Sequence, residues 1–175
     1  MATTNLFAGN DRWTDLSVTM HGTEGAFLIS CSGIVNVGGN TCDANGLVAV
    51  GPSAGYAVPL ALFPSNHGYG FAALWLPEGQ TPADPPARGG TQISAGVFAP
   101  GIGPTLYPIH DALLKANETG SGPWHLWGIC NDNDYGDNSL NWVVTAAVYD
   151  YPDVPSITAV AALVANVPTI QLSGS

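Results

Sequence analysis

The side chains best suited to chemistry lie in one octapeptide, residues 131–138, which reads Asn-Asp-Asn-Asp-Tyr-Gly-Asp-Asn. Six of its eight side chains carry an amide or carboxylate oxygen, and three of the chain's thirteen acidic residues are here. Carboxylates this close together repel one another, and no Lys or Arg lies nearby in sequence to neutralise them. A bound Ca²⁺ ion would neutralise these carboxylates, because it takes about six to eight oxygen ligands from carboxylates, amides and backbone carbonyls. The pattern favours a calcium loop over an Asx-rich hairpin turn, which these turn-forming residues leave open as the alternative.

Two apolar, strand-like segments at 124–130 and 140–149 must position the octapeptide. An EF-hand is excluded, because its twelfth position requires a bidentate Glu and Trp142 stands there. Similar apolar clusters, separated by Gly and Pro, predict further strands, and good helix formers predict one short helix at 109–117. The further strands are expected at 13–19, 26–30, 34–37, 47–50, 58–63, 71–76 and 93–99.

The composition predicts an all-β domain. The chain has 22 Gly and 14 Pro in 175 residues, which suits many turns between short strands. By size it is one domain, expected over 1–151, with a C-terminal extension over 152–175 that packs on the same domain or at an oligomer contact. Its formal net charge of −10 excludes the basic surface that nucleic acid or an anionic membrane requires.

The octapeptide and its flanks resemble a known calcium loop. In the small calcium-dependent galactophilic lectins of the Pseudomonas type, a strand ends in Asn-Asp, continues to Tyr-Gly, and closes with Asn-Asn-Ser before the final strand. Here Asn131-Asp132, Tyr135-Gly136 and Asp137-Asn138-Ser139 stand in that order. Residues 25–38 and 71–75 are similar to two other strands of the family, so the likeness covers about half of the chain. The resemblance implies an all-β sandwich of the galactose-binding-domain-like jelly-roll type, with one short helical insertion.

The resemblance also implies a ligand set and a partner. Asp132, Asp137 and Asn138 would bind Ca²⁺ through their side chains, and Val37 and Asp134 would bind it through their backbone carbonyls. Two vicinal hydroxyls of a galactose-type sugar would complete the coordination shell, so that the partner would be a carbohydrate. Because each such site binds weakly, the family likeness predicts a homo-oligomer that multiplies them.

The residues that choose the sugar are predicted less directly. The family's sugar-contacting His and Gln have no match at the corresponding positions, but Asn66 and His67 could reach the site from their own loop. Aromatic rings stack against sugars, and Tyr135 in the loop is the best placed of the candidates. The other aromatic candidates are Tyr69, Trp124, Trp127 and Trp142. The chain also differs from the family by Asp137 in place of Asn and by insertions at 80–90 and 105–121.

Two other functions, an enzyme and a structural subunit, are alternatives to a lectin. An enzyme is not expected, because His110 and Asp111 are adjacent on the predicted helix and therefore do not face each other. A structural or assembly β-sandwich subunit remains the alternative, in which the acidic loop is a turn or binds calcium only structurally.

The cellular setting is predicted from what the sequence lacks. No signal peptide or transmembrane segment is recognisable, which predicts a cytoplasmic protein or one exported by a non-classical route. Three cysteines are expected as buried free thiols, with a Cys31–Cys42 bond as the alternative.

Overall fold

The computed structural model describes residues 1–21, 24–47, 68–84, 96–108, 123–132 and 134–150. Within these ranges the chain forms strands and no helix, as the composition predicts for an all-β protein. The strands are β1 (Ala2–Phe7), β2 (Thr14–Met20), β3 (Glu24–Ser32), β4 (Val35–Val37), β5 (Asn40–Cys42), β6 (Phe71–Pro77), β7 (Val97–Phe98), β8 (Thr105–Pro108), β9 (Trp124–Cys130) and β10 (Asn141–Asp150).

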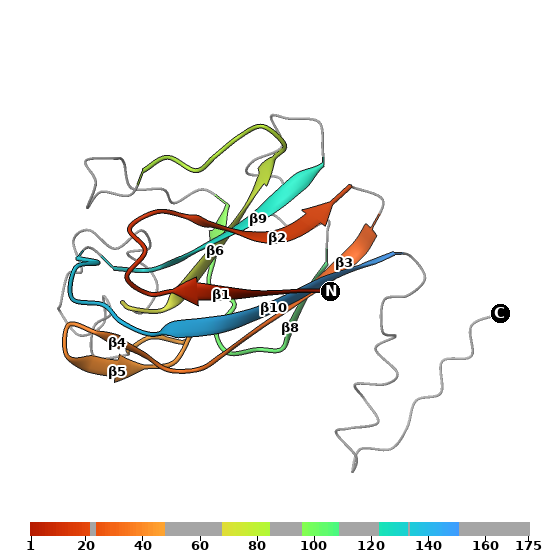
Figure 1. Ribbon diagram of the computed structural model, residues 1–175. Helices are drawn as coiled ribbons and strands as arrows, with labels where there is room; N and C mark the ends of the chain where they lie inside the picture. The colour runs from red at the N-terminus through yellow and green to blue at the C-terminus, as the bar shows by residue number, and fades with distance from the viewer. Residues whose placement is uncertain (22–23, 48–67, 85–95, 109–122, 133, 151–175) are drawn as a thin grey trace, which may run out of the picture.

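The strands form two four-stranded sheets that pack face to face, which makes the protein a β-sandwich (Figure 1). One sheet has the order β1-β10-β3-β8 and the other has the order β2-β9-β6-β7, and β4 and β5 pair as a separate hairpin. All strand pairs are antiparallel. The consecutive strands β9 and β10 therefore lie in different sheets, and the octapeptide crosses from one layer to the other.

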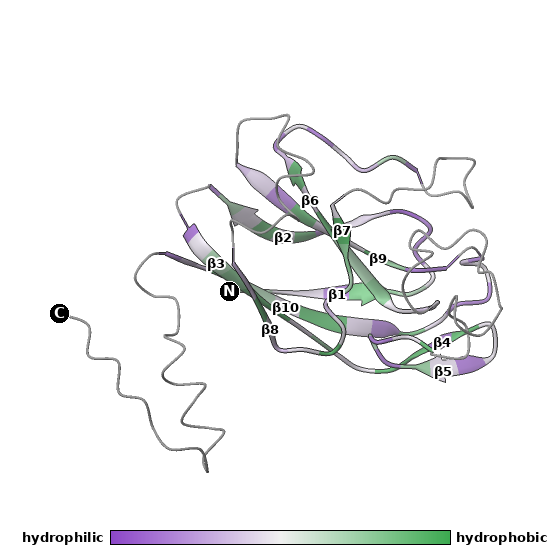
Figure 2. Ribbon diagram, turned by 180° about the vertical axis from the view of Figure 1, so that it is seen from behind, coloured by the Kyte–Doolittle hydropathy of each residue, from purple (hydrophilic) through white to green (hydrophobic). Residues whose placement is uncertain are grey.

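Aromatic side chains from the two sheets meet in the core. Phe27 of β3 contacts Trp75 of β6 edge to face, with ring centroids 5.2 Å apart. Phe71 of β6 lies against Trp142 of β10 at 6.3 Å. These contacts join the two layers over both ends of β6, and each adds about 0.5–1.5 kcal/mol beyond the area that it buries. Figure 2 shows the same division, with hydrophobic residues along the strands and hydrophilic residues in the loops beside β4 and β5.

Gly128 allows β9 to approach the opposite layer closely. A Cβ at this position would lie 2.9 Å from the ring of Phe71 and 3.1 Å from a methyl group of Leu16. The backbone alternation of β9 therefore points Leu126 and Gly128 into the core and Trp127 to the outer face of its sheet.

Most of the strand predictions that fall on described residues are confirmed. Strands lie where they were expected near 13–19, 26–30, 34–37, 71–76, 124–130 and 140–149. In the 93–99 segment, the described strand is Val97–Phe98, and in the 47–50 segment Leu47 makes an isolated bridge to Gly68. The segment 58–63, the helix at 109–117, residues 85–90 of the first insertion and the extension 152–175 lie outside the described residues.

One expectation is corrected and three strands were not predicted. The 105–121 insertion begins with strand β8, which pairs with β3 between Ala26↔Pro108 and Ile29↔Thr105, so its first four residues belong to the sandwich. The strands β1, β5 and β8 were missed because they carry few apolar residues, and β1 directs only Leu6 fully into the core. Of the residues described, none belongs to a helix long and apolar enough to cross a bilayer.

Candidate functional site

The octapeptide is held by backbone hydrogen bonds to two other segments. At its start, Asn131 donates to the carbonyl of Gly70 at 2.8 Å and accepts from the N–H of Tyr69 at 2.8 Å. Just after its end, Ser139 exchanges two hydrogen bonds with Asn36 of β4, at 2.8 and 3.0 Å. The loop between β9 and β10 therefore lies beside the β4-β5 hairpin at one end of the sandwich (Figure 1).

Asp132 and Asn138 form a buried polar pair inside this loop. Asp132 is 3% exposed and Asn138 is 8% exposed, and the amide nitrogen of Asn138 donates to Oδ2 of Asp132 at 2.8 Å. The same nitrogen donates to the carbonyl of Ala8, in the connection between β1 and β2, at 3.1 Å. The amide oxygen of Asn138 is buried and has no hydrogen-bond partner among the residues that the structure describes, a state that costs about 1–3 kcal/mol. The site thus contains an acceptor that protein donors do not satisfy.

Asp134 shapes the exposed part of the loop. Its N–H donates to Oδ1 of Asp132 at 3.4 Å, and its own Oδ1 accepts from the N–H of Gly136 at 3.0 Å. These are Asx turns, in which a side-chain oxygen replaces a backbone carbonyl. The predicted contribution of Asp134 is its backbone carbonyl, and the turn leaves the side chain exposed.

The Val37–Gly38 peptide lies next to Asp137. Gly38 and Gly39 have φ of 57° and 78°, and Val37 pairs with Asn40, which is the geometry of a two-residue type I′ hairpin turn. A Cβ on Gly38 would lie 3.4 Å from Oδ2 of Asp137. The structure therefore brings Val37, Asp132, Asp137 and Asn138 to the same end of the molecule.

Tyr135 does not lie where the sequence interpretation placed it. The side chain is 6% exposed, and its hydroxyl donates to the carbonyl of Cys130 at 2.9 Å. Burial is the main reason why the pKa of this phenol is raised above its usual value. Its ring packs in the core and presents no face to a ligand. Asn66 and His67, the other predicted sugar contacts, lie outside the described residues.

Tyr69, one of the aromatic candidates named from the sequence, lies beside the Val37–Gly38 turn. Its φ is 65°, and its hydroxyl lies 3.8 Å from where a Cβ on Gly38 would stand. The side chain is half-buried, so part of the ring is accessible. The flanking Gly68 and Gly70 are the only sequence signal of the tight backbone here, and they say nothing about which loop the ring faces.

All three cysteines are buried free thiols, as predicted. Cys42 and Cys130 both donate to the carbonyl of Tyr69, with sulfur–oxygen distances of 3.6 and 3.8 Å. Desolvation raises the pKa of Cys42 to about 11 and that of Cys31 to about 12, with a smaller contribution from Asp43. Desolvation is also the main reason why the pKa of the Cys130 thiol is raised well above its usual value. Protonated thiols of this kind pack as small apolar groups and are poor metal ligands.

The oxygen atoms of the loop suit a hard cation better than a soft one. No three His, Cys, Asp or Glu side chains in the described ranges gather closely enough to hold a metal ion. The group present is instead mixed, with the buried carboxylate of Asp132, the exposed carboxylate of Asp137 and the unpaired amide oxygen of Asn138. Such mixed oxygen sets are typical of Ca²⁺ sites.

The fold and the site together define an all-β sandwich with an oxygen-rich loop that connects its two sheets. A scan against protein-family models and a search of curated proteins found no match to the chain.

Proposed function

We propose that this protein is a calcium-dependent lectin that binds a galactose-type carbohydrate at the 131–138 loop. The observation that carries the proposal is the buried, unpaired amide oxygen of Asn138 beside the buried carboxylate of Asp132. A cation would satisfy the amide oxygen and neutralise the charge of the carboxylate at once, whereas a turn that only connects two strands has no need to bury either group.

Each predicted ligand has a physical reason to serve. The amide nitrogen of Asn138 is engaged by Asp132 and Ala8, which leaves its oxygen as the free end of the group. Asp137 is exposed and adds a second negative charge beside the Val37–Gly38 turn. The carbonyls of Val37 and Asp134 complete the proposed set. Bound Ca²⁺ would supply open coordination positions for two vicinal sugar hydroxyls, and the exposed side of the loop gives the sugar access.

Charge and valency fit the same role. A bound cation would reduce the self-repulsion that a formal net charge of −10 implies. Exchange of calcium-bound water for sugar hydroxyls yields little net free energy, so each site is expected to be weak. A homo-oligomer would make such sites useful through avidity.

Retention on galactose–agarose, measured in calcium and again in EDTA, tests the proposal. We expect retention in calcium, elution by EDTA, and recovery of binding when calcium is restored. A glycan array under the same two conditions would then identify the preferred sugar. Retention that survives chelation, or the absence of binding to any glycan in calcium, would refute the calcium-lectin mechanism.

A structural or assembly subunit is the second candidate, and exposed apolar residues favour it. Phe7, Ile34, Leu140 and Val143 are 37–57% exposed. Phe7 pairs with Asn141 in the sheet, and a Cβ on Gly33 would lie 3.1 Å from the carbonyl of Asn141, so these side chains gather near the start of β10. Sedimentation velocity in calcium and in EDTA tests this reading. If the sedimentation coefficient shows a stable oligomer that is unchanged by EDTA, and the protein binds no glycan, the structural role is supported.

A further inference from the structure

A pocket outside the calcium loop is built around two tryptophans on the outer face of the β2-β9-β6-β7 sheet. Trp127 faces outward from β9, because its neighbours Leu126 and Gly128 face the core. Trp13 directly precedes β2, and the pairing of Asp15 with Trp127 brings the start of β2 beside this part of β9. None of the residues that line the pocket belongs to the octapeptide or to the β4-β5 hairpin.

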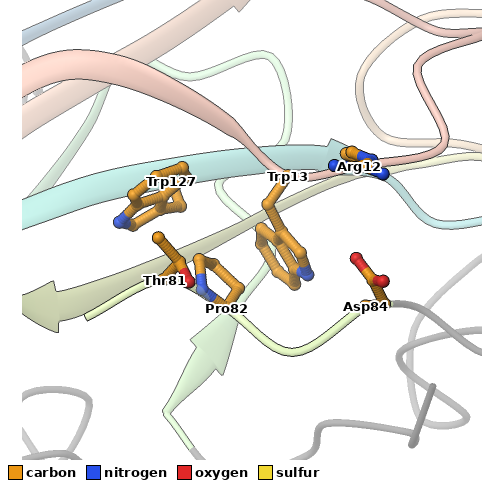
Figure 3. Close-up of a pocket in the computed structure, with 6 residues that line it drawn as sticks. All are labelled: Arg12, Trp13, Thr81, Pro82, Asp84 and Trp127. Carbon is orange, nitrogen blue, oxygen red and sulfur yellow. The ribbon is translucent and has the colours of Figure 1, made fainter.

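The pocket has the size of a single small ring. Its volume is about 230 Å³, below the roughly 300–1,000 Å³ of sites for drug-sized ligands. Figure 3 shows the indole rings of Trp127 and Trp13 with Pro82 between them in this view, and Arg12 above Asp84 at the end beyond Trp13. The lining residues are Arg12, Trp13, Thr81, Pro82, Asp84 and Trp127.

The pocket lining combines aromatic rings with one hydrogen-bond donor group and one acceptor group. Indole rings present an electron-rich face that attracts the weakly positive C–H groups of a saturated ring. Arg12 is one of only three Lys or Arg residues in the chain, and it contributes donors only, whereas the carboxylate of Asp84 contributes acceptors only. A ligand that satisfies both must carry donors and acceptors on one face and C–H groups on the other. A pyranose ring has this arrangement.

A neutral ligand fits the charge of the pocket. One guanidinium and one carboxylate line it, so the pocket has no net charge of its own, and the chain around it has a formal net charge of −10. An acidic sugar would meet Asp84 and the overall negative field. A proline-rich peptide also packs on tryptophan rings, but it follows an extended groove rather than a one-ring cavity.

We propose that this pocket is a second carbohydrate subsite, which binds one neutral pyranose ring without calcium. Trp127, which is partly exposed, provides the main stacking surface, Trp13, which is 7% exposed, adds the small accessible part of its ring, and Arg12 and Asp84 hydrogen-bond the ring hydroxyls at one end. The subsite does not depend on the loop at 131–138, so its test is separate from that of the calcium site.

The five tryptophan indole N–H signals in a ¹H–¹⁵N correlation spectrum report on the pocket directly. The full chain is titrated in EDTA with methyl glycosides of galactose, glucose and mannose, up to about 100 mM, a hundredfold above a 1 mM dissociation constant. We expect the signals of Trp13 and Trp127 to shift in a saturable way. The signals of the core residues Trp75 and Trp142, which are fully buried, should not move.

Variants assign the effect to the pocket. Trp127→Ala should weaken the dissociation constant at least tenfold, and its matched control is Trp124→Ala, on the same strand but outside the pocket. Arg12→Gln changes an exposed side chain and should weaken binding severalfold with an unchanged fold, so the proposal stays testable if Trp127→Ala unfolds. The absence of any saturable shift with all three glycosides would overturn the proposal. Shifts that a proline-rich peptide causes and the glycosides do not would overturn it as well, in favour of peptide binding.

Discussion

The clearest test of the loop is the substitution Asp132→Asn, which removes a charge and almost no volume. In the protein, Oδ2 of Asp132 accepts from Asn138 at 2.8 Å in a site that is 3% exposed. An Asn oxygen can still accept that hydrogen bond, with a difference of about 1 kcal/mol between a charged and a neutral acceptor, but the amide nitrogen cannot accept the longer 3.4 Å bond from the N–H of Asp134. Because the variant also avoids burying a charge, we expect its stability in EDTA to stay within about 1 kcal/mol of the parent protein.

The substitution should have a much larger effect on how strongly calcium stabilises the protein. A cation at a hundredfold excess over its dissociation constant stabilises the folded state by about 2.7 kcal/mol. For a chain of 175 residues this corresponds to a rise in Tm of about 5–11 °C, since each kcal/mol shifts Tm by about 2–4 °C. Without its buried carboxylate, the Asp132→Asn variant should show little of this rise.

Differential scanning calorimetry of both proteins, in EDTA and in calcium, measures the two effects together. Asp15→Asn is the matched control, because Asp15 is an exposed carboxylate that also accepts a backbone N–H, at 2.8 Å from Ser17. The control should keep the full calcium response. A variant at Asp132 that keeps it too would refute the assignment of this carboxylate, and a parent protein without any response would refute the metal site.

Three further predictions concern the hairpin, the core and the thiols. Gly38→Ala and Gly39→Ala should each cost about 1–2 kcal/mol, because both φ angles are positive. Only Gly38→Ala should weaken calcium binding in calorimetric titration, since its Cβ would stand 3.4 Å from the carboxylate of Asp137, whereas a Cβ on Gly39 would meet no described atom within 4 Å. Gly128→Ala should lower the free energy of unfolding by about 1–3 kcal/mol in urea titration, because the added methyl group would overlap the ring of Phe71, and an unchanged midpoint would contradict this packing. The raised pKa of Cys42 favours the folded state below pH 9, and this contribution should be lost as pH rises from the usual value of 9.0 toward about 11, because the unfolded chain ionises first. Denaturation at a series of pH values should show a shallower loss for Cys42→Ala, and an equal slope would argue against the shift.

The sequence predicted the strands that cross the core, and it predicted them for a physical reason. Segments such as β6 and β10 bury large side chains, Trp75 and Trp142 among them, so their apolar clusters are visible in the sequence. The strands β5 and β8 are short, and β1 is largely polar. β1 and β8 pair with strands far along the chain, and β5 pairs with the adjacent β4 in a short hairpin; in each case the backbone hydrogen bonds leave no pattern in residue type.

The loop shows the same limit on a smaller scale. The density of Asp and Asn predicts an oxygen-rich turn, and the structure brings the predicted Asp132 and Asn138 into contact. The role of Ala8 could not be predicted, because it contributes only a backbone carbonyl. Tyr135 was predicted to lie near the sugar because it stands in the loop, but its ring packs into the core and its hydroxyl donates to the carbonyl of Cys130.

The crossing of the octapeptide between the layers has a consequence for how the protein opens. The loop is joined by hydrogen bonds to Ala8 just after β1, to Asn36 of the β4-β5 hairpin and to the Tyr69–Gly70 segment just before β6, and its two ends continue into β9 and β10 of different sheets. Its buried amides should therefore exchange with deuterium about as slowly as those of the sandwich, and not at the fast rate of an ordinary surface turn. A ligand that binds this loop tightly would therefore stabilise the contact between the two sheets. It should slow their separation, and with it the cleavage of the protein by proteases.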